Sequence, residues 1–253
     1  MMVKKIAPFT INISILNNKE IKKMADKIRG VVDVIFLIDV TGSMGKCIEA
    51  VKNNIRSFFK TMTSEEGNGS PVKDWRAKIV GFRDFVEDGP ERWLIDNPFT
   101  RDVHTLEEQL TEIKADGGGD IPESLLDALY KLITAGETGP QEEPDSFKWR
   151  PKRAAARVIV IFTDAPYKTP MSIPEAAGLD IEAIFNEIEQ KRIILSIFAP
   201  DDECYYTLSE APRSEYMKAQ GQALDSLTSD PAAFAKLMKQ LAKSVSQSAT
   251  VIL

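Results

Sequence analysis

Short apolar runs alternate with helix-like patterns along most of this chain, from residue 31 to about residue 245. The first run, VVDVIFLID at 31–39, is almost continuously apolar, which is typical of a strand covered on both faces of a sheet. Similar runs follow at residues 76–85, 92–100, 157–164 and 193–200. Strands alternating with helices predict a mostly parallel sheet with right-handed crossovers. We therefore expect a doubly wound α/β fold with helices on both faces and one antiparallel edge strand, formed by 92–100.

Helical periodicity fills the segments between these runs. Apolar residues recur at steps of three and four from Ile48 to Met62, and further helices are expected at 105–113, 122–134 and 180–191. A last helix begins near Asp230, a preferred N-cap residue, with proline following at the first helical position.

Residues 1–30 lie outside this alternation. They are expected to form either an extra edge strand followed by a short helix at 18–29, or a flexible arm. We divide the chain into this N-terminal extension and one domain over residues 31–253.

Composition argues against several classes of protein. The net charge is −6 over 253 residues, and no basic stripe is available to neutralise nucleic-acid phosphates. The basic segment WRPKR (149–153) is interpreted as a solvated loop rather than a phosphate or membrane patch. The two cysteines, Cys47 and Cys204, fit no metal or disulfide pattern, and no run approaches the ~20 apolar residues of a membrane helix. A cytoplasmic, reduced protein is expected.

Oxygen-bearing side chains follow three of the predicted strands and helices. The carboxyl ends of parallel strands meet at one edge of a sheet, where ligands bind, and chain direction also brings the turn DGGGDIPE to that edge. Oxygen ligands at about 2.1 Å are what Mg²⁺ prefers. The turn residues after the first strand are also common in any strand-to-helix turn, so they point to a metal only in combination. Chain direction therefore brings together six oxygen-bearing residues, Asp39, Thr41, Ser43, Asp120, Glu123 and Asp164, as candidate metal ligands.

These residues carry a resemblance to a known family. DVTGSM, GGGDIPES and IVIFTDAP match, in order, the three loops of a von Willebrand factor A domain and its metal-ion-dependent adhesion site. The resemblance covers residues 31 to about 245. The order GFRDF, PFT and GGGDIPE looks like the A domains found beside alpha-type kinases and in many bacterial intracellular proteins.

The resemblance implies a role for each loop. Thr41 and Ser43 would bind the metal directly, while Asp39 and Asp164 would hold it directly or through water. The second loop departs from the commonest form, which has threonine, so Glu123 would take that place and Asp120 would support it or bind a neighbouring cation. The implied ion is Mg²⁺, or else Mn²⁺ or Ca²⁺. The implied function is a non-enzymatic protein-binding module that captures a carboxylate of a protein partner.

Other interpretations of the same residues remain open. Asp120 and Glu123 have the spacing of a capping box and could serve only a helix start. The fold could be a scaffold that binds partners elsewhere and keeps only a structural metal. A magnesium-dependent phosphohydrolase with Asp39 as its nucleophile would need a second aspartate where Thr41 stands.

Four further residues are candidates for a functional or structural role: Arg83, Asp84, Cys47 and His104. Arg83 and Asp84 end the second predicted strand at the same edge, and a structural role is the simpler interpretation. Cys47, in the first turn of a helix, could have a lowered pKa, but no histidine stands ready to activate it. The single histidine, His104, is expected to be a cap or a surface residue.

Overall fold

A computed structural model describes residues 30–64, 72–117, 121–139, 142–218 and 230–250. The six strands are β1 (Val31–Asp39), β2 (Asp74–Phe82), β3 (Leu94–Asp96), β4 (Ala156–Phe162), β5 (Ile193–Ala199) and β6 (Ser214–Lys218). The helices are η1 (Gly42–Met44), α2 (Gly45–Thr63), α3 (Phe85–Asp88), α4 (Val103–Glu112), α5 (Leu125–Ile133), α6 (Ile181–Lys191), α7 (Glu203–Leu208) and α9 (Pro231–Thr250).

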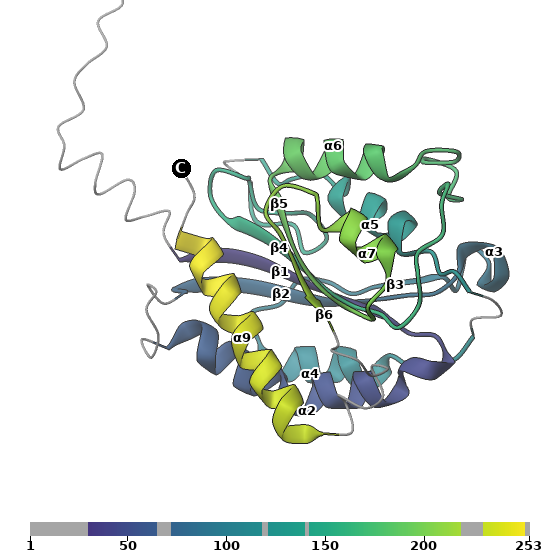
Figure 1. Cartoon of the computed structure of the whole chain (residues 1–253). Helices are drawn as coiled ribbons and strands as arrows, with labels where there is room; N and C mark the ends of the chain where they lie inside the picture. The colour runs from purple at the N-terminus through teal and green to yellow at the C-terminus, as the bar shows by residue number, and fades with distance from the viewer. Residues whose placement is uncertain (1–29, 65–71, 118–120, 140–141, 219–229, 251–253) are drawn as a thin grey trace, which may run out of the picture.

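The strands form one sheet in the order β3-β2-β1-β4-β5-β6 (Figure 1). Only β3 is antiparallel to its neighbour. Helices α2, α4 and α9 cover one face, and α5, α6 and α7 cover the other. The predicted doubly wound α/β fold with one antiparallel edge strand is therefore confirmed. We call the edge at which the parallel strands end the carboxyl edge, and the opposite one the amino edge.

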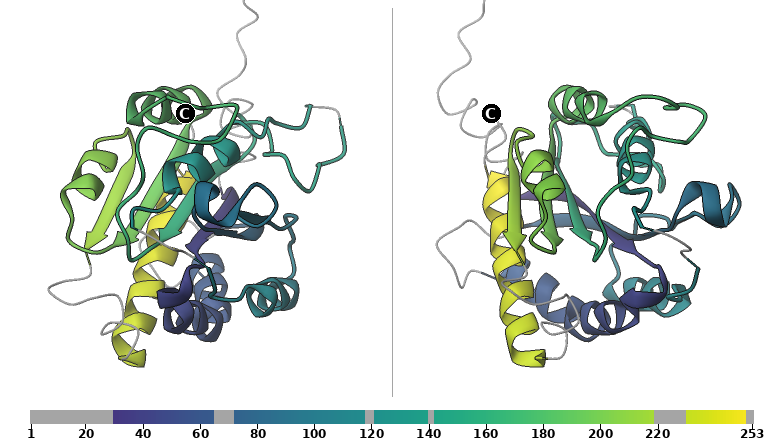
Figure 2. Two further views of the ribbon diagram at one scale, coloured as in Figure 1. Left: turned by 90° about the vertical axis from the view of Figure 1, so that its right-hand side faces the viewer. Right: turned by 45° about the vertical axis from the view of Figure 1, so that its right-hand side comes forward.

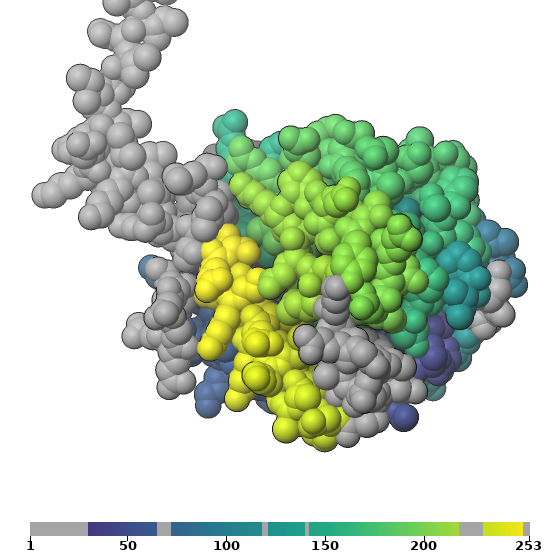
Figure 3. Space-filling view, viewed as in Figure 1, coloured from purple at the N-terminus to yellow at the C-terminus, as the bar shows by residue number. Residues whose placement is uncertain are grey.

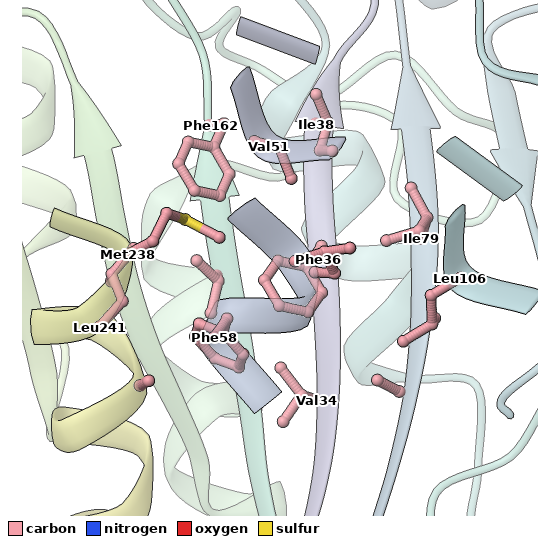
Figure 4. Close-up of a cluster of buried hydrophobic side chains, with 14 of the residues drawn as sticks. Val34, Phe36, Ile38, Val51, Phe58, Ile79, Leu106, Phe162, Met238 and Leu241 are labelled. Carbon is pink, nitrogen blue, oxygen red and sulfur yellow. The ribbon is translucent and has the colours of Figure 1, made fainter. Parts of the chain in front are cut away.

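Strand β1 lies at the centre because both of its faces are apolar. Val34, Phe36 and Ile38 enter the core under α2 and α9, while Ile35 and Leu37 enter the core on the other face. Figure 4 shows how side chains of β1, α2 and α9 meet in the first core. There the Phe36 and Phe58 rings lie 5.1 Å apart, edge to face, an arrangement that stabilises aromatic pairs. Burial of this strand fixes the position of its last residue, Asp39.

Several elements are shorter in the structure than the sequence predicts. Strand β2 ends at Phe82 rather than at residue 85, because the Asp84 carboxylate caps α3 by accepting the N–H groups of Val86 and Glu87. Strand β3 has three residues rather than nine. Helix α5 begins at Leu125 rather than at residue 122.

The carboxyl-terminal third holds two elements that the sequence did not reveal. Asp202 caps α7 by accepting the N–H of Cys204, and β6 follows as a sixth strand. The N-cap role of Asp230 is confirmed, since its carboxylate accepts the N–H groups of Ala232 and Ala233. The strand and helix considered for residues 1–30 lie almost wholly outside the described residues.

The segment 149–153 corrects another prediction. Instead of a solvated loop, it packs against the amino edge of the sheet, where Trp149 is buried and Arg150 is only 7% exposed. The Arg150 guanidinium and backbone N–H both donate to Asp33 on β1. At least one of its basic residues, Arg150, is therefore buried and paired with an acid of the core sheet. Among the residues described, no helix has both the length and the apolar composition needed to cross a bilayer.

Candidate metal centre

The first loop is built around Asp39, the last residue of β1. Its side chain is completely buried, and both carboxylate oxygens accept hydrogen bonds. Oδ1 accepts the backbone N–H of Thr41 at 2.9 Å and the Thr41 hydroxyl at 2.7 Å. Oδ2 accepts the hydroxyl of Thr163 at 3.0 Å. The acid therefore has a fixed position between the first loop and the end of β4.

Burial raises the pKa of Asp39 to about 6, because the charged carboxylate loses hydration; the hydrogen bonds from Thr41 oppose this rise, and the nearby charge of Asp164 adds to it. Among the described residues, no cationic side chain forms an ion pair with Asp39. Thr41 is nearly buried beside it, whereas Ser43 in η1 is exposed and Asp164 is half-buried. The first and third loops thus place two acids and two threonine hydroxyls together.

The second loop is joined to the first by backbone hydrogen bonds. The N–H of Asp116 donates to the Val40 carbonyl at 3.0 Å, and the N–H of Gly42 donates to the Gly117 carbonyl at 3.3 Å. Gly117 has a φ of +73°, and a Cβ there would lie 2.3 Å from a carboxylate oxygen of Asp88. The positive φ and the close approach of Asp88 and Arg83 both favour glycine at this position.

Arg83 holds the beginning of this loop in place. Its guanidinium donates to the backbone carbonyls of Asp116, Lys114 and Arg92 at 2.7, 3.0 and 2.9 Å. It also forms an ion pair of 2.8 Å with the Asp116 carboxylate. These bonds confirm the structural role expected for Arg83.

Glu123 joins the second loop to the third. Its N–H donates to the Pro166 carbonyl at 2.9 Å, and its own carbonyl accepts the N–H of Lys168 at 2.7 Å. The side chain is 3% exposed. Because α5 begins at Leu125, Glu123 precedes the helix and cannot be the third helical residue of a capping box. The capping interpretation of Glu123 is therefore wrong, while Asp120 lies outside the described residues.

Asp84 has a structural role at the same edge. Burial alone would raise the pKa of its carboxyl, but the ion pair with Lys168 at 2.5 Å and the N–H groups of the α3 cap lower it overall. Ser124 accepts the Phe85 N–H at 2.9 Å, so α3 is also attached to the segment that carries Glu123. These contacts make one connected unit of the second loop, the third loop and α3.

Two residues of this unit were missed from the sequence. Thr163 precedes Asp164 directly, and a hydroxyl at the end of an apolar strand could have identified it. The Tyr205 hydroxyl, on α7, donates to the Ala165 carbonyl in the third loop. No local pattern predicts that contact, because α7 itself was not predicted.

Cys47 and His104 lie outside the group of oxygen-bearing side chains at the carboxyl edge. Cys47 is buried behind the first loop, and burial raises the pKa of its thiol, with the charges of Asp164 and Asp39 adding to the rise. The lowered pKa considered for this cysteine is therefore wrong. The His104 side chain is 70% exposed beside Glu107 on α4, so the surface role is confirmed.

The donor set fits a hard divalent cation that is held by hydroxyls as well as acids. Among the residues described, no three histidine, cysteine or acidic side chains converge closely enough to hold a metal by themselves. A cation here would need the oxygens of Thr41 and Ser43 in addition to the carboxylates, and such oxygen ligands suit Mg²⁺. The assignment of the six predicted ligands remains a prediction.

Comparisons with known proteins point to the same family as the three loops. Residues 33–141 match the family model described as von Willebrand factor A domain. The matched region contains the first two loops and ends before Asp164. The sheet order and helix layers described above agree with the α/β fold of such a domain.

Two relatives are longer proteins. The chain is 28% identical over 151 residues to alpha-protein kinase vwkA of Dictyostelium discoideum, a match covering 59% of this chain and 21% of that protein. It is 33% identical over 132 residues to human von Willebrand factor A domain-containing protein 7, covering 52% of this chain and 13% of that protein. The chain therefore corresponds to a small part of each relative.

Proposed function

We propose that this chain is a metal-dependent protein-binding module that captures an acidic residue of a protein partner. Thr41 and Ser43 would hold a divalent cation, Mg²⁺ or else Mn²⁺ or Ca²⁺, with Asp39 and Asp164 beside it. Glu123, or Asp120, would complete the protein ligands from the second loop. When bound, the cation supplies positive charge and an open coordination position for a partner's carboxylate.

The observation that carries this proposal is the environment of Asp39. Its carboxylate is fully buried and accepts only hydroxyl and backbone N–H groups among the described residues. A buried acid is normally paired with a cation or neutralised by protonation. A divalent ion bound by the neighbouring hydroxyls would balance both Asp39 and Asp164, and the hydrogen bonds that join the three loops support such a site.

The acid in the second loop would tune the site toward its partner. Asp39, Glu123 and Asp164 would together place three negative charges around a 2+ ion, whereas threonine in place of Glu123 would leave the site neutral. One unit charge at ~4 Å is worth roughly 4 kcal/mol at an effective dielectric near 20, before hydration is counted. Glu123→Thr should therefore weaken cation binding but strengthen the capture of an acidic partner at saturating Mg²⁺.

An enzymatic role is the weaker alternative. A phosphohydrolase would need Asp39 to attack, but both of its oxygens are engaged and its side chain is buried. Thr41 stands where such an enzyme needs a general acid. We expect no Mg²⁺-dependent hydrolysis of ATP or of p-nitrophenyl phosphate; turnover that disappears in Asp39→Asn would contradict this expectation.

Calorimetry on chelator-stripped protein tests the cation site. Mg²⁺ should bind at about one site, and Asp39→Ala should abolish the binding. Asp116→Ala is the matched control, because it removes an acid at the same edge that lies outside the predicted ligand set. Equal Mg²⁺ binding by Asp39→Ala and by the unaltered protein would remove Asp39 from the site.

A pull-down from native lysate, with Mg²⁺ and again with EDTA, tests the partner. Under the proposal, capture requires Mg²⁺ and fails in Asp39→Ala. Capture that survives both EDTA and Asp39→Ala would favour the alternative, a scaffold that binds partners through another surface. The expected cytoplasmic location stays a prediction.

A further inference from the structure

Two large apolar side chains are exposed at the carboxyl edge, beside the candidate metal centre. Val86, the second residue of α3, is 60% exposed, and Ile121, in the second loop, is 70% exposed. Among the described residues, these two are the most exposed of the large hydrophobic side chains. Apolar residues scattered singly over a surface are ordinary, but a pair that the fold brings to one site marks a surface for interaction.

Hydrogen bonds and chain distance place both residues close to Glu123, the predicted ligand of the second loop. The N–H of Phe85, next to Val86, donates to the Ser124 hydroxyl at 2.9 Å, and Ser124 follows Glu123 directly. Ile121 stands two residues before Glu123, so the Cα atoms of these two residues are at most about 7 Å apart. Val86 and Ile121 therefore lie on two segments that meet at Glu123.

Helix α3 is held firmly in this place. The Asp84 carboxylate caps the helix and forms an ion pair with Lys168, whose N–H donates to the Glu123 carbonyl at 2.7 Å. Asp88, at the end of α3, lies against Gly117 of the second loop. The left view of Figure 2 looks onto the carboxyl edge, with α3 toward the viewer, and α3 forms part of the right-hand rim of the surface in Figure 3. The helix therefore presents Val86 on the outer surface of this edge.

The charge at this edge argues against a partner selected by acidity alone. Glu87 follows Val86 and is exposed, and the whole chain has a net charge of −6. A segment with several adjacent acids would meet like charges here, which weakens association. A single acid with apolar neighbours avoids this repulsion and brings apolar surface to Val86 and Ile121.

We propose that Val86 and Ile121 select the partner, and that the captured segment carries one acidic residue with a large aliphatic residue two positions away from it. This inference rests on the proposed function, in which the acid would bind the cation. In an extended segment, side chains two positions apart point to the same face and lie about 7 Å from each other. That spacing matches the separation of Glu123 and Ile121, so the aliphatic side chain packs on Ile121 and Val86 while the acid faces the metal centre.

Fluorescence anisotropy with labelled peptides tests the proposal on the full chain at saturating Mg²⁺. The probe peptide carries Leu-Ser-Glu-Ser-Leu between glycines. Its isomer, Ser-Leu-Glu-Leu-Ser, has the same composition, but its leucines point to the face opposite the acid. The probe should bind at least about tenfold more tightly than the isomer, the factor expected when one leucine side chain is buried. EDTA should abolish the binding of the probe.

Substitutions assign this preference to the two apolar residues. Val86→Ser and Ile121→Ser should each weaken binding of the probe at least about threefold, and together they should remove its advantage over the isomer. Mg²⁺ binding without peptide, measured by calorimetry, should be unchanged in both variants. Phe147→Ser is the matched control and should leave probe binding unchanged, since Phe147 is 47% exposed and its ring centroid lies 5.9 Å from Nζ of Lys78, in the middle of β2.

The outcomes separate this inference from the proposed function. Mg²⁺-dependent binding of equal strength for the probe and its isomer would overturn the inference and leave the proposed function standing. So would a preference for the probe that persists in the double variant, or failure of the probe to bind at millimolar concentration to protein that binds Mg²⁺. Binding that survives EDTA, or that is equally strong for Leu-Ser-Gln-Ser-Leu, would contradict the proposed function and the inference together.

Discussion

Asp33 and Asp39 stand near opposite ends of the same strand, and both are completely buried, but their charges are handled differently. Asp33, at the amino edge, accepts hydrogen bonds from the guanidinium groups of Arg76 and Arg150, at distances of 2.7 to 3.1 Å. Arg150 also reaches the carboxylate of Asp74 at 2.7 Å. The buried charge of Asp33 is thus balanced by arginines of the same chain.

Asp39, at the carboxyl edge, has no such cationic partner among the described residues. Asp39 accepts hydrogen bonds from two threonines, Thr41 and Thr163, and Asp164 adds a further negative charge nearby. Arg83, at the same edge, is committed to the backbone of the second loop and to Asp116. The comparison separates a buried acid that serves the fold from one that is suited to an external cation.

The largest expected effect is at the amino edge. Asp33→Asn leaves two buried guanidinium groups without their shared carboxylate, and breaking a buried ion pair in this way costs about 3–5 kcal/mol. The free energy of unfolding, measured by urea titration in EDTA, should fall by that amount.

Asp39→Asn is the matched substitution at the other end of β1. An asparagine oxygen can still accept from Thr41, so without metal the change should stay within about 1 kcal/mol. Equal losses of unfolding free energy in Asp33→Asn and Asp39→Asn would contradict the claim that only Asp33 is paired with cationic side chains.

The second expected effect is the stabilisation of the carboxyl edge by added Mg²⁺. At a Mg²⁺ concentration of 100 times the dissociation constant, the unaltered protein should gain about 2.7 kcal/mol of stability. The gain should vanish in Asp39→Asn and persist in Asp116→Asn. Thermal unfolding with and without EDTA measures both; a gain that survives in Asp39→Asn would break the assignment.

The third effect concerns Glu123. Glu123→Gln keeps both backbone hydrogen bonds to the third loop but removes one charge, so Mg²⁺ affinity should fall about tenfold, or about 1.4 kcal/mol. Stability in EDTA should change little. Calorimetry measures the Mg²⁺ affinity of this variant, and unfolding in EDTA measures its stability without metal. Unchanged Mg²⁺ affinity would exclude Glu123 from the site.

The smallest expected effect concerns Asp127, a buried acid with no cationic partner among the described residues. Asp127, on α5, is buried, and one of its oxygens accepts the N–H groups of Ser172 and Ile173. Its other oxygen has no hydrogen-bond partner among the described residues. Burial raises the pKa of Asp127, and the charge of Asp84 adds to the rise against the opposing backbone bonds.

A raised pKa in the folded state means that ionised Asp127 destabilises the fold at neutral pH, and that this penalty disappears as the pH falls toward the ordinary value of 3.8. Asp127→Asn should therefore raise the melting temperature at pH 7 by the equivalent of about 1 kcal/mol or less. The gain should shrink toward pH 4. A difference independent of pH between 4 and 8 would contradict the sign.

Local patterns were sufficient for most of the framework. The apolar run of β1, the periodicity of α2 and the N-cap of α9 are properties of consecutive residues, and each was predicted close to its observed position. The meeting of the three loops also followed from the sequence, because parallel strands must end at one edge. Short elements were missed: β6 and α7 have five and six residues, too few for a periodic signal.

The partners of the buried charges could be decided only by the tertiary structure. Asp33 is paired with Arg76 and Arg150, which lie 43 and 117 positions further along the chain. Arg150 belongs to a basic segment that by itself resembles a solvated loop. The sequence by itself determined which acids stand at the ends of β1, because strand periodicity is local. Which of them meets an arginine depends on packing between distant segments, since a charge interacts with whatever the fold brings within a few ångströms.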